Sequence, residues 1–80
     1  MAGGVTELDL HGKNRHQAAV AIDSALRKSA GVYRIRLIHG HNSGTAIREL
    51  IDERYSRHPK VLRVVRGANP GVTELVLREF

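Results

Sequence analysis

The sequence of 80 residues contains no cysteine and no tryptophan, and only three of its residues are aromatic. Without cysteine there can be no disulfide, no thiolate nucleophile and no zinc site that uses cysteine, and such a composition is typical of a reducing compartment. No apolar run approaches the length that spans a bilayer, and the first residues lack the basic and apolar regions of a secretion signal. We therefore expect a soluble, cytoplasmic protein.

The scarcity of aromatic side chains also limits the core, which must be built from Leu, Ile, Val and Ala. A chain of this length supports one small core, so we expect a single domain over residues 1–80 with its core at about 6–79. Such a core suits a compact two-layer domain and leaves no room for a large cofactor cavity. We expect a monomer that needs no cofactor.

Negative charge is in the minority, with 8 Asp and Glu against 13 Lys and Arg, which gives a net charge of +5. Arginine supplies most of the positive charge, and its guanidinium group pairs bidentately with phosphate and stacks on bases. This balance favours a polyanionic partner, nucleic acid above all. Net charge reports on non-specific binding, however, and carries no information about chemistry.

The segment Leu-Asp-Leu-His-Gly that begins at Leu8 predicts the first strand. Because side chains alternate between the two faces of a strand, Leu8 and Leu10 would face a core. Asp9 and His11 would then share the other face, with His11 where the strand ends at Gly12. Such a pair can share a proton, an orienting hydrogen bond or a phosphate. An ordinary solvated strand end has the same pattern.

Two helices are predicted by apolar residues at helical spacing. Asn14 and Gln17 have the spacing of a capping box, which favours a helix that starts at once and covers about 15–29. A second helix covers about 45–57, where Pro59 prevents its continuation.

Alternating patterns predict further strands over about 33–38, 61–66 and 72–79, the last two joined as a hairpin. In the third strand we expect Leu62 and Val64 to face the core. The order β-α-β-α-β-β predicts an α/β (α+β) two-layer sandwich, a four-stranded mixed sheet with both helices on one face, because right-handed crossovers place them on the same side. The open face would carry charged residues, namely Glu7, Asp9, Arg34, Arg36, Arg63 and Arg78.

A loop of polar residues and glycine, 39–45, joins the second strand to the second helix. Its glycines would let backbone amides approach a ligand, and the helix start that follows offers unpaired N–H groups, which favours an anion such as phosphate. An ordinary strand-to-helix connection has a similar composition. Because parallel strands end at the same edge of a sheet, we expect His11 to lie near this loop.

Taken together, these segments resemble the Smr (small MutS-related) domain family. The family's marks are a Leu-Asp-Leu-His-Gly segment, a His-Gly-x-Gly-type loop and a glycine-rich turn before a Thr-containing last strand, which here are Leu8 to Gly12, His39 to Gly44 and Gly67 to Thr73. The resemblance covers about residues 6–79. It implies a fold similar to the C-terminal domain of bacterial translation initiation factor three.

The resemblance also implies a function, since Smr domains are known as endonucleases that nick DNA or cleave RNA. They often occur attached to MutS-like, ribosome-associated or RNA-binding partners. We therefore expect a nucleic-acid endonuclease, and we favour cleavage of RNA over nicking of DNA. A ribosome or a translation or repair assembly is expected as a further partner. The expected catalytic residues are Asp9, His11 and His39.

In this hypothesis His11, oriented by Asp9, acts as general base or acid, and a second imidazole from His39 or His41 serves the leaving oxygen. Backbone amides of residues 40–45 would stabilise the transition state, with Lys13 or Arg36 nearby. The expected phosphate- and nucleic-acid-binding residues are Gly12, Lys13, Gly40, His41, Asn42, Ser43, Gly44, Thr45, Arg34, Arg36 and Arg63.

Three alternatives remain open. RNA can be cleaved by its own 2′-OH without a metal, but a divalent metal could assist through ligands drawn from Glu7, Asp9, His11, His39 and His41. A non-catalytic nucleic-acid or ribosome-binding module would use the open basic face to track phosphates. A protein-interaction domain would need an exposed apolar patch, for which the open face offers Val61, Val65, Val72 and Val76.

Overall fold

The computed structural model describes residues 4–40, 46–67 and 70–78. Along the chain lie β1 (Gly4–Asp9), α1 (Arg15–Arg27), β2 (Val32–Ile38), α2 (Ala46–Leu50), the π-helical η1 (Ile51–Tyr55), β3 (Arg63–Arg66) and β4 (Val72–Val76). Within these residues the strands form one four-stranded sheet in the order β1-β2-β4-β3. β1 and β2 are parallel, and β4 is antiparallel to both β2 and β3.

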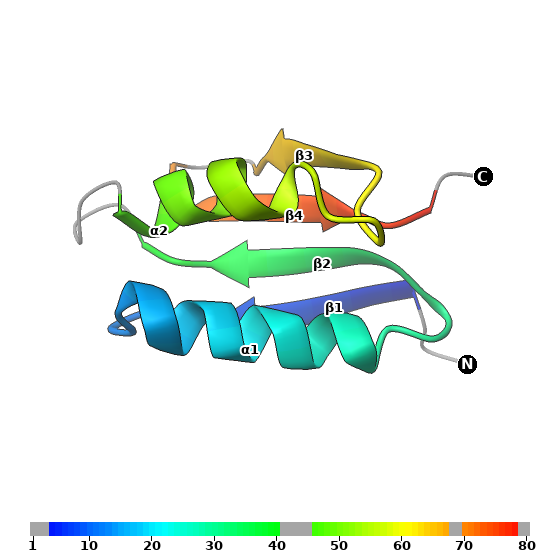
Figure 1. The fold of residues 1–80 in the computed structure, drawn as a ribbon, viewed down its shortest axis with the longest axis horizontal. Coiled ribbons are helices and arrows are strands. Elements are labelled where there is room, and N and C mark those ends of the chain that lie inside the picture. The colour runs from blue at the N-terminus through cyan, green and yellow to red at the C-terminus, as the bar shows by residue number, and fades with distance from the viewer. Residues whose placement is uncertain (1–3, 41–45, 68–69, 79–80) are drawn as a thin grey trace.

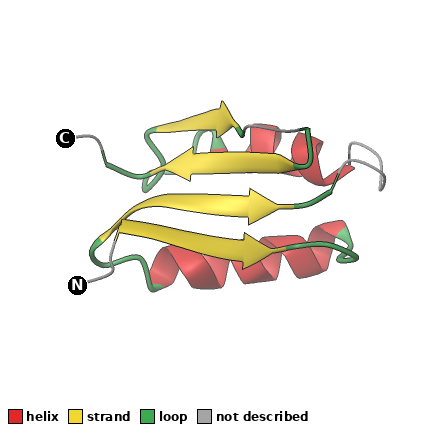
Figure 2. Cartoon of the chain, turned by 180° about the vertical axis from the view of Figure 1, so that it is seen from behind, coloured by secondary structure: helices red, strands yellow, loops and turns green. Residues whose placement is uncertain are grey.

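The helices cover one face of this sheet and leave the other face open. In Figure 1, α1 lies in front of the β1 and β2 side, while α2 and η1 lie on the β4 and β3 side. Figure 2, seen from behind, shows the sheet in front of both helices. η1 continues α2 without a break, so the two together are the predicted second helix. The predicted fold class, a two-layer sandwich around a mixed sheet, is confirmed.

The start of α1 is held by the capping box that the sequence predicts. The Asn14 side chain accepts a hydrogen bond from the Gln17 backbone N–H at 2.8 Å, and the Gln17 side chain accepts one from the Asn14 N–H at 3.0 Å. Both bonds satisfy backbone donors that the first helical turn would otherwise leave unpaired. The chain therefore turns from the end of β1 into α1 within a few residues.

The core lies between the sheet and the helices and is aliphatic except for Tyr55. The Tyr55 ring is fully buried, and its hydroxyl lies 2.8 Å from Asp23 Oδ1 and 3.2 Å from the Ala19 carbonyl oxygen. Burial and the bond to Asp23 raise the pKa of the Tyr55 hydroxyl above its ordinary value. This contact ties η1 to α1. The largest aliphatic side chains in this core are Leu10, Ile22, Leu26, Ile35, Leu37, Ile51 and Leu75.

The third strand is shorter than predicted and begins at Arg63. The expectation that Leu62 faces the core is wrong, because its side chain is 59% exposed while that of Val61 is buried. Regular pairing with β4 starts only at Arg63, so strand alternation cannot be extended back to Leu62. Val64, inside the strand, does pack against the core as expected.

The open face of the sheet is stabilised by a network of charged side chains centred on Glu74. Its carboxylate accepts a bond from Arg34 Nη1 at 2.5 Å and one from Arg36 Nε at 3.1 Å, and Arg36 also donates to Glu7 at 3.0 Å. The strand register explains these contacts, since Arg36 lies directly between Glu7 on β1 and Glu74 on β4. The predicted basic face is therefore largely neutralised where it crosses β2.

These ion pairs change the proton affinities of the groups involved. The hydrogen bonds that Arg36 donates to Glu74 and Glu7 raise the pKa of Arg36 above its ordinary value. Burial alone would raise the pKa of the Glu74 carboxyl group, but the hydrogen bonds from Arg34 and Arg36 together lower it below the ordinary range. Glu74 is consequently a carboxylate throughout the neutral range.

The exposed apolar patch that a protein-interaction domain would need is absent from the described part of this face. Val76 is only 1% exposed and Val61 is buried on the helix side of the sheet. Val65 and Val72 are half-buried. The four valines therefore belong to the fold and do not offer a contiguous docking surface.

Replacing Glu74 with Gln should flatten the dependence of stability on pH in acid. The pKa of this carboxyl group is lower in the folded protein than its ordinary value of 4.5, so its contribution is fully present above that value and is lost as the pH falls through the folded pKa. At neutral pH the variant should lose about 1 kcal/mol, since a charge-assisted hydrogen bond becomes a neutral one. Urea unfolding of both proteins between neutral pH and about pH 3 measures the effect.

The matched control is Glu53→Gln, because the Glu53 carboxylate also pairs with an arginine, Arg15, but is 69% exposed. This variant should follow the wild type at every pH, since exposed ion pairs contribute little. Stability curves that stay parallel for the wild type and Glu74→Gln through the acid range would contradict the role given to Glu74.

Candidate nucleic-acid site

The ends of the parallel strands β1 and β2 bring His11 next to Gly40. The pairing of Asp9 with Ile38 continues past both strands, because the Leu10 N–H donates to the Ile38 carbonyl oxygen at 2.8 Å. A Cβ atom placed on Gly40 would lie 3.7 Å from His11 Cδ2. The His11 side chain is exposed. The juxtaposition of His11 and the start of loop 39–45 is therefore present, as the parallel strands predict.

Asp9 holds the backbone of His11 and not its ring. Asp9 Oδ1 accepts a hydrogen bond from the His11 backbone N–H at 2.9 Å. The next residue, Gly12, has a φ of 78°, a left-handed conformation that favours glycine, and the Lys13 N–H donates back to the Leu10 carbonyl oxygen at 3.0 Å. The carboxylate thus helps to define the turn from which the imidazole projects.

His39 lies in the interior, in contrast to His11. Its side chain is 1% exposed, with Nδ1 2.9 Å from the Gly40 carbonyl oxygen and Nε2 2.9 Å from Thr73 Oγ1. A carbonyl oxygen can only accept, so Nδ1 carries a proton. Thr73 Oγ1 also accepts from Arg66 Nη1 at 3.4 Å and can donate its own proton to Nε2. Because a hydroxyl can either donate or accept, Thr73 can pair with Nε2 whether or not that nitrogen carries a proton.

The contacts of His39 belong to a longer chain of polar side chains that starts on η1. Asp52 Oδ2 lies 2.6 Å from Arg66 Nη2, and Arg66 reaches the fully buried hydroxyl of Thr73. The chain then passes through His39 to the carbonyl group of Gly40. Sequence reasoning did not identify the roles of Asp52, Arg66 and the Thr73 hydroxyl. The sequence did contain one signal for this chain of contacts. Thr73 stands at an inward position of an alternating strand, and a buried hydroxyl needs a hydrogen-bond partner.

The backbone of Gly40 is tied to β4 through Gly71. The Gly71 carbonyl oxygen accepts hydrogen bonds from the His39 N–H at 2.9 Å and from the Gly40 N–H at 3.0 Å. The Gly40 amide, expected to bind phosphate, is therefore engaged within the protein. Most of the predicted anion loop lies outside the described residues, namely His41, Asn42, Ser43, Gly44 and Thr45.

The basic residues expected at the site are spread over the sheet. Arg34 and Arg36 lie further back along β2 and are held by Glu74. Arg63 is exposed on β3, where it is paired in register with Val76. Lys13 is exposed, and among the expected cations it lies nearest to His11 in the sequence, two residues after it.

The side chains proposed as metal ligands do not gather in the described part of the chain. There, no group of three or more His, Cys, Asp or Glu side chains is placed to hold a metal ion. Glu7 pairs with Arg36 and His39 is interior, while His41 lies outside the described residues. The same described residues include no helix that is long and apolar enough to cross a membrane.

Comparisons with known proteins agree with this arrangement. The family model of the Smr domain matches residues 8–74. The crystal structure of the Smr domain of Thermus thermophilus MutS2 is similar, with a TM-score of 0.79 and 32% sequence identity over 92% of this chain and 99% of that chain. A comparison with curated proteins finds no significant match.

The region that matches the family model contains each part of the site described above. It includes the end of β1 with His11, the end of β2 with His39 and Gly40, and the start of β4 with Thr73. Smr domains in general bind nucleic acids and are related to nucleases. The match to the family model and the similarity to a solved Smr domain show that the chain belongs to the Smr domain family.

Proposed function

We propose that the chain is an endoribonuclease in which His11 performs acid–base catalysis on a phosphodiester of RNA. The observation that carries the proposal is the exposed position of the His11 ring beside Gly40, just past the ends of β1 and β2. An imidazole at such an edge is accessible to the backbone of a polymer and can serve as general acid or base.

The 2′-OH of RNA supplies the attacking group, so the reaction needs only proton transfer and charge stabilisation. His11 takes the proton of the 2′-OH while O2′ forms a bond to phosphorus and the bond from phosphorus to O5′ breaks. The leaving oxygen is protonated by a second acid, His41 or water, to give a 2′,3′-cyclic phosphate and a 5′-hydroxyl. Lys13 stabilises the extra negative charge on phosphate in the transition state.

His39 has a positioning role in this proposal. Its ring is buried, and both of its nitrogens are hydrogen-bonded. It connects Thr73 on β4 with the Gly40 carbonyl group, and so supports the backbone against which the His11 ring lies. Of the two histidines that the strand ends bring together, His11 is thus the one that reaches substrate.

Replacing His11 with Ala should reduce cleavage of labelled single-stranded RNA by at least about 100-fold, the range expected for loss of a general acid–base group. RNA affinity should be nearly unchanged. His16→Ala is the matched control, because His16 is also exposed and lies in the first turn of α1. Cleavage is followed with a chelator present throughout, and products are tested for a 2′,3′-cyclic phosphate.

Undiminished cleavage by the His11→Ala protein would end the proposal. Cleavage that continues at a position carrying a single 2′-deoxy nucleotide would exclude attack by the 2′-OH. Binding without any cleavage by the wild-type protein, with or without a divalent metal, would replace the proposed enzyme with a non-catalytic binding module.

The two substitutions Asp9→Asn and Asp9→Ala should separate a structural from a chemical role of this carboxylate. Because Asp9 accepts a bond from a backbone N–H, the amide oxygen of Asn can take its place, and we expect cleavage within about threefold of wild type. Alanine removes the acceptor, and a misplaced His11 should lower the turnover rate by about tenfold or more. Equal losses in both variants would show that the negative charge itself is needed.

Thr73→Val should lower the turnover rate by about tenfold, because His39 Nε2 then lacks its partner and the support of Gly40 is weakened. Stability should fall by about 1–3 kcal/mol, the cost of a buried polar group left unpaired. Thr73→Ser keeps the hydroxyl and should restore the rate. Turnover and KM are measured well below the melting temperature of each variant, and a Val variant with wild-type turnover would refute the positioning role.

A further inference from the structure

Two adjoining hollows lie at the end of the molecule away from His11. The first, of about 430 Å³, is lined by residues around the C-terminal end of α1 and the end of β4, and the second, of about 370 Å³, lies between α1 and the residues that follow η1. Both include Arg27 and Lys60 in their walls, so they form one continuous depression. In Figure 1 this end of α1 lies at the right, whereas β1 and β2 end at the left.

The lining of this depression is strongly basic. We call it the basic groove and define it by the cations Arg27, Arg54, Lys60 and Arg78 together with Ser29 and His58. Asp23 is the acidic residue of the lining, and it is already bound to Arg54 and to the Tyr55 hydroxyl. Positive charge therefore exceeds negative charge here by about three.

The charges of the basic groove are available, unlike those of the open sheet face. Within the described residues, Arg27 and Arg78 are exposed and their side chains make no hydrogen bond or ion pair. Lys60 Nζ lies 3.3 Å from the Leu26 carbonyl oxygen, a neutral partner that leaves its charge uncompensated. On the open face, by contrast, Arg34 and Arg36 are bound by carboxylates. Of these two surfaces, the basic groove is therefore the one that offers an anion guanidinium groups without a carboxylate partner among the described residues.

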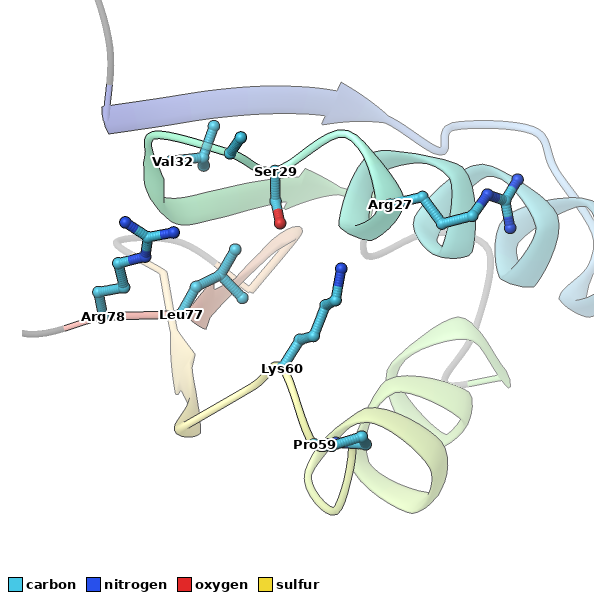
Figure 3. A pocket seen from close by; sticks show the side chains of 8 residues that line it. Arg27, Ser29, Val32, Pro59, Lys60, Leu77 and Arg78 are labelled. Atoms are coloured by element: carbon cyan, nitrogen blue, oxygen red, sulfur yellow. The ribbon is translucent and has the colours of Figure 1, made fainter.

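The shape of the groove indicates an extended ligand. Figure 3 shows the Lys60 amino group pointing toward the end of α1, with Arg27 to one side and Arg78 to the other. Cations spaced along an open depression suit a row of phosphates better than a single enclosed anion, which would need convergent donors. The Ser29 hydroxyl already donates to the Leu26 carbonyl oxygen at 2.7 Å, so the cations are the groups that the groove offers to phosphate.

We propose that the basic groove is a second nucleic-acid contact, which binds backbone phosphates of a single strand at a distance from the His11 end. The molecule is 34 Å long, so a strand that contacts both ends must cover about this distance. The groove anchors the strand without reading its sequence. This proposal concerns binding alone and therefore does not depend on the cleavage proposed for His11.

The test compares Arg27→Gln/Arg78→Gln with Lys28→Gln/Arg57→Gln, a pair with the same loss of charge whose side chains do not line the groove. Binding of a 2′-O-methyl RNA strand of about 12 nucleotides, which cannot be cleaved through its 2′-OH, is measured by fluorescence anisotropy over a range of salt concentrations. The groove variant should lose about tenfold in affinity, and its slope of log K against log salt should fall by about 1.4, or 0.7 for each lost phosphate contact. The control should change by less than about threefold.

Equal losses of affinity and slope in the two variants would overturn the proposal, because diffuse charge would then explain binding. Circular dichroism and urea unfolding establish that both variants are folded. Displacement of the RNA by inorganic phosphate at constant ionic strength would reassign the groove to a free phosphate ion. Displacement by polyglutamate as effective as by polyuridylate would reassign it to an acidic protein.

Discussion

The parallel pairing of β1 with β2 is the constraint on which the rest of the molecule depends. Parallel neighbours cannot be joined by a tight turn, so the chain must cross back over the sheet, and α1 makes this crossing. Both strands then end at the same edge. The bond from the Leu10 N–H to the Ile38 carbonyl oxygen continues the pairing to that edge, which makes His11 and Gly40 neighbours although they are far apart in the sequence.

The same register gives the two histidines opposite environments. Leu8 is paired with Leu37, so the next inward residues on the two strands are Leu10 and His39, and His11 falls level with Gly40 on the other side. An offset of one residue between the two His-Gly segments therefore buries one imidazole and exposes the other. The buried ring is hydrogen-bonded to Thr73, and the exposed ring is accessible to solvent.

The positive charge of the chain is divided between two surfaces with different consequences. On the open sheet face, cross-strand neighbours pair Arg34 and Arg36 with Glu74, so the charges stabilise the uncovered side of the sheet. At the end of α1, Arg27 and Arg78 have no such neighbours within the described residues. We therefore expect the helical side and the strand ends to attract a polyanion more strongly than the open sheet face does.

Features that depend on near neighbours along the chain were predictable from the sequence. The order of the elements, the capping box of Asn14 and Gln17, and the inward side chain of Leu10 all follow from spacing of two to four residues. The tertiary structure was needed for the features that depend on the pairing of distant strands. It placed His39 against Thr73, engaged the amide of Gly40 with Gly71, and turned Leu62 outward, because cross-strand register and strand ends are set by contacts that no local pattern contains.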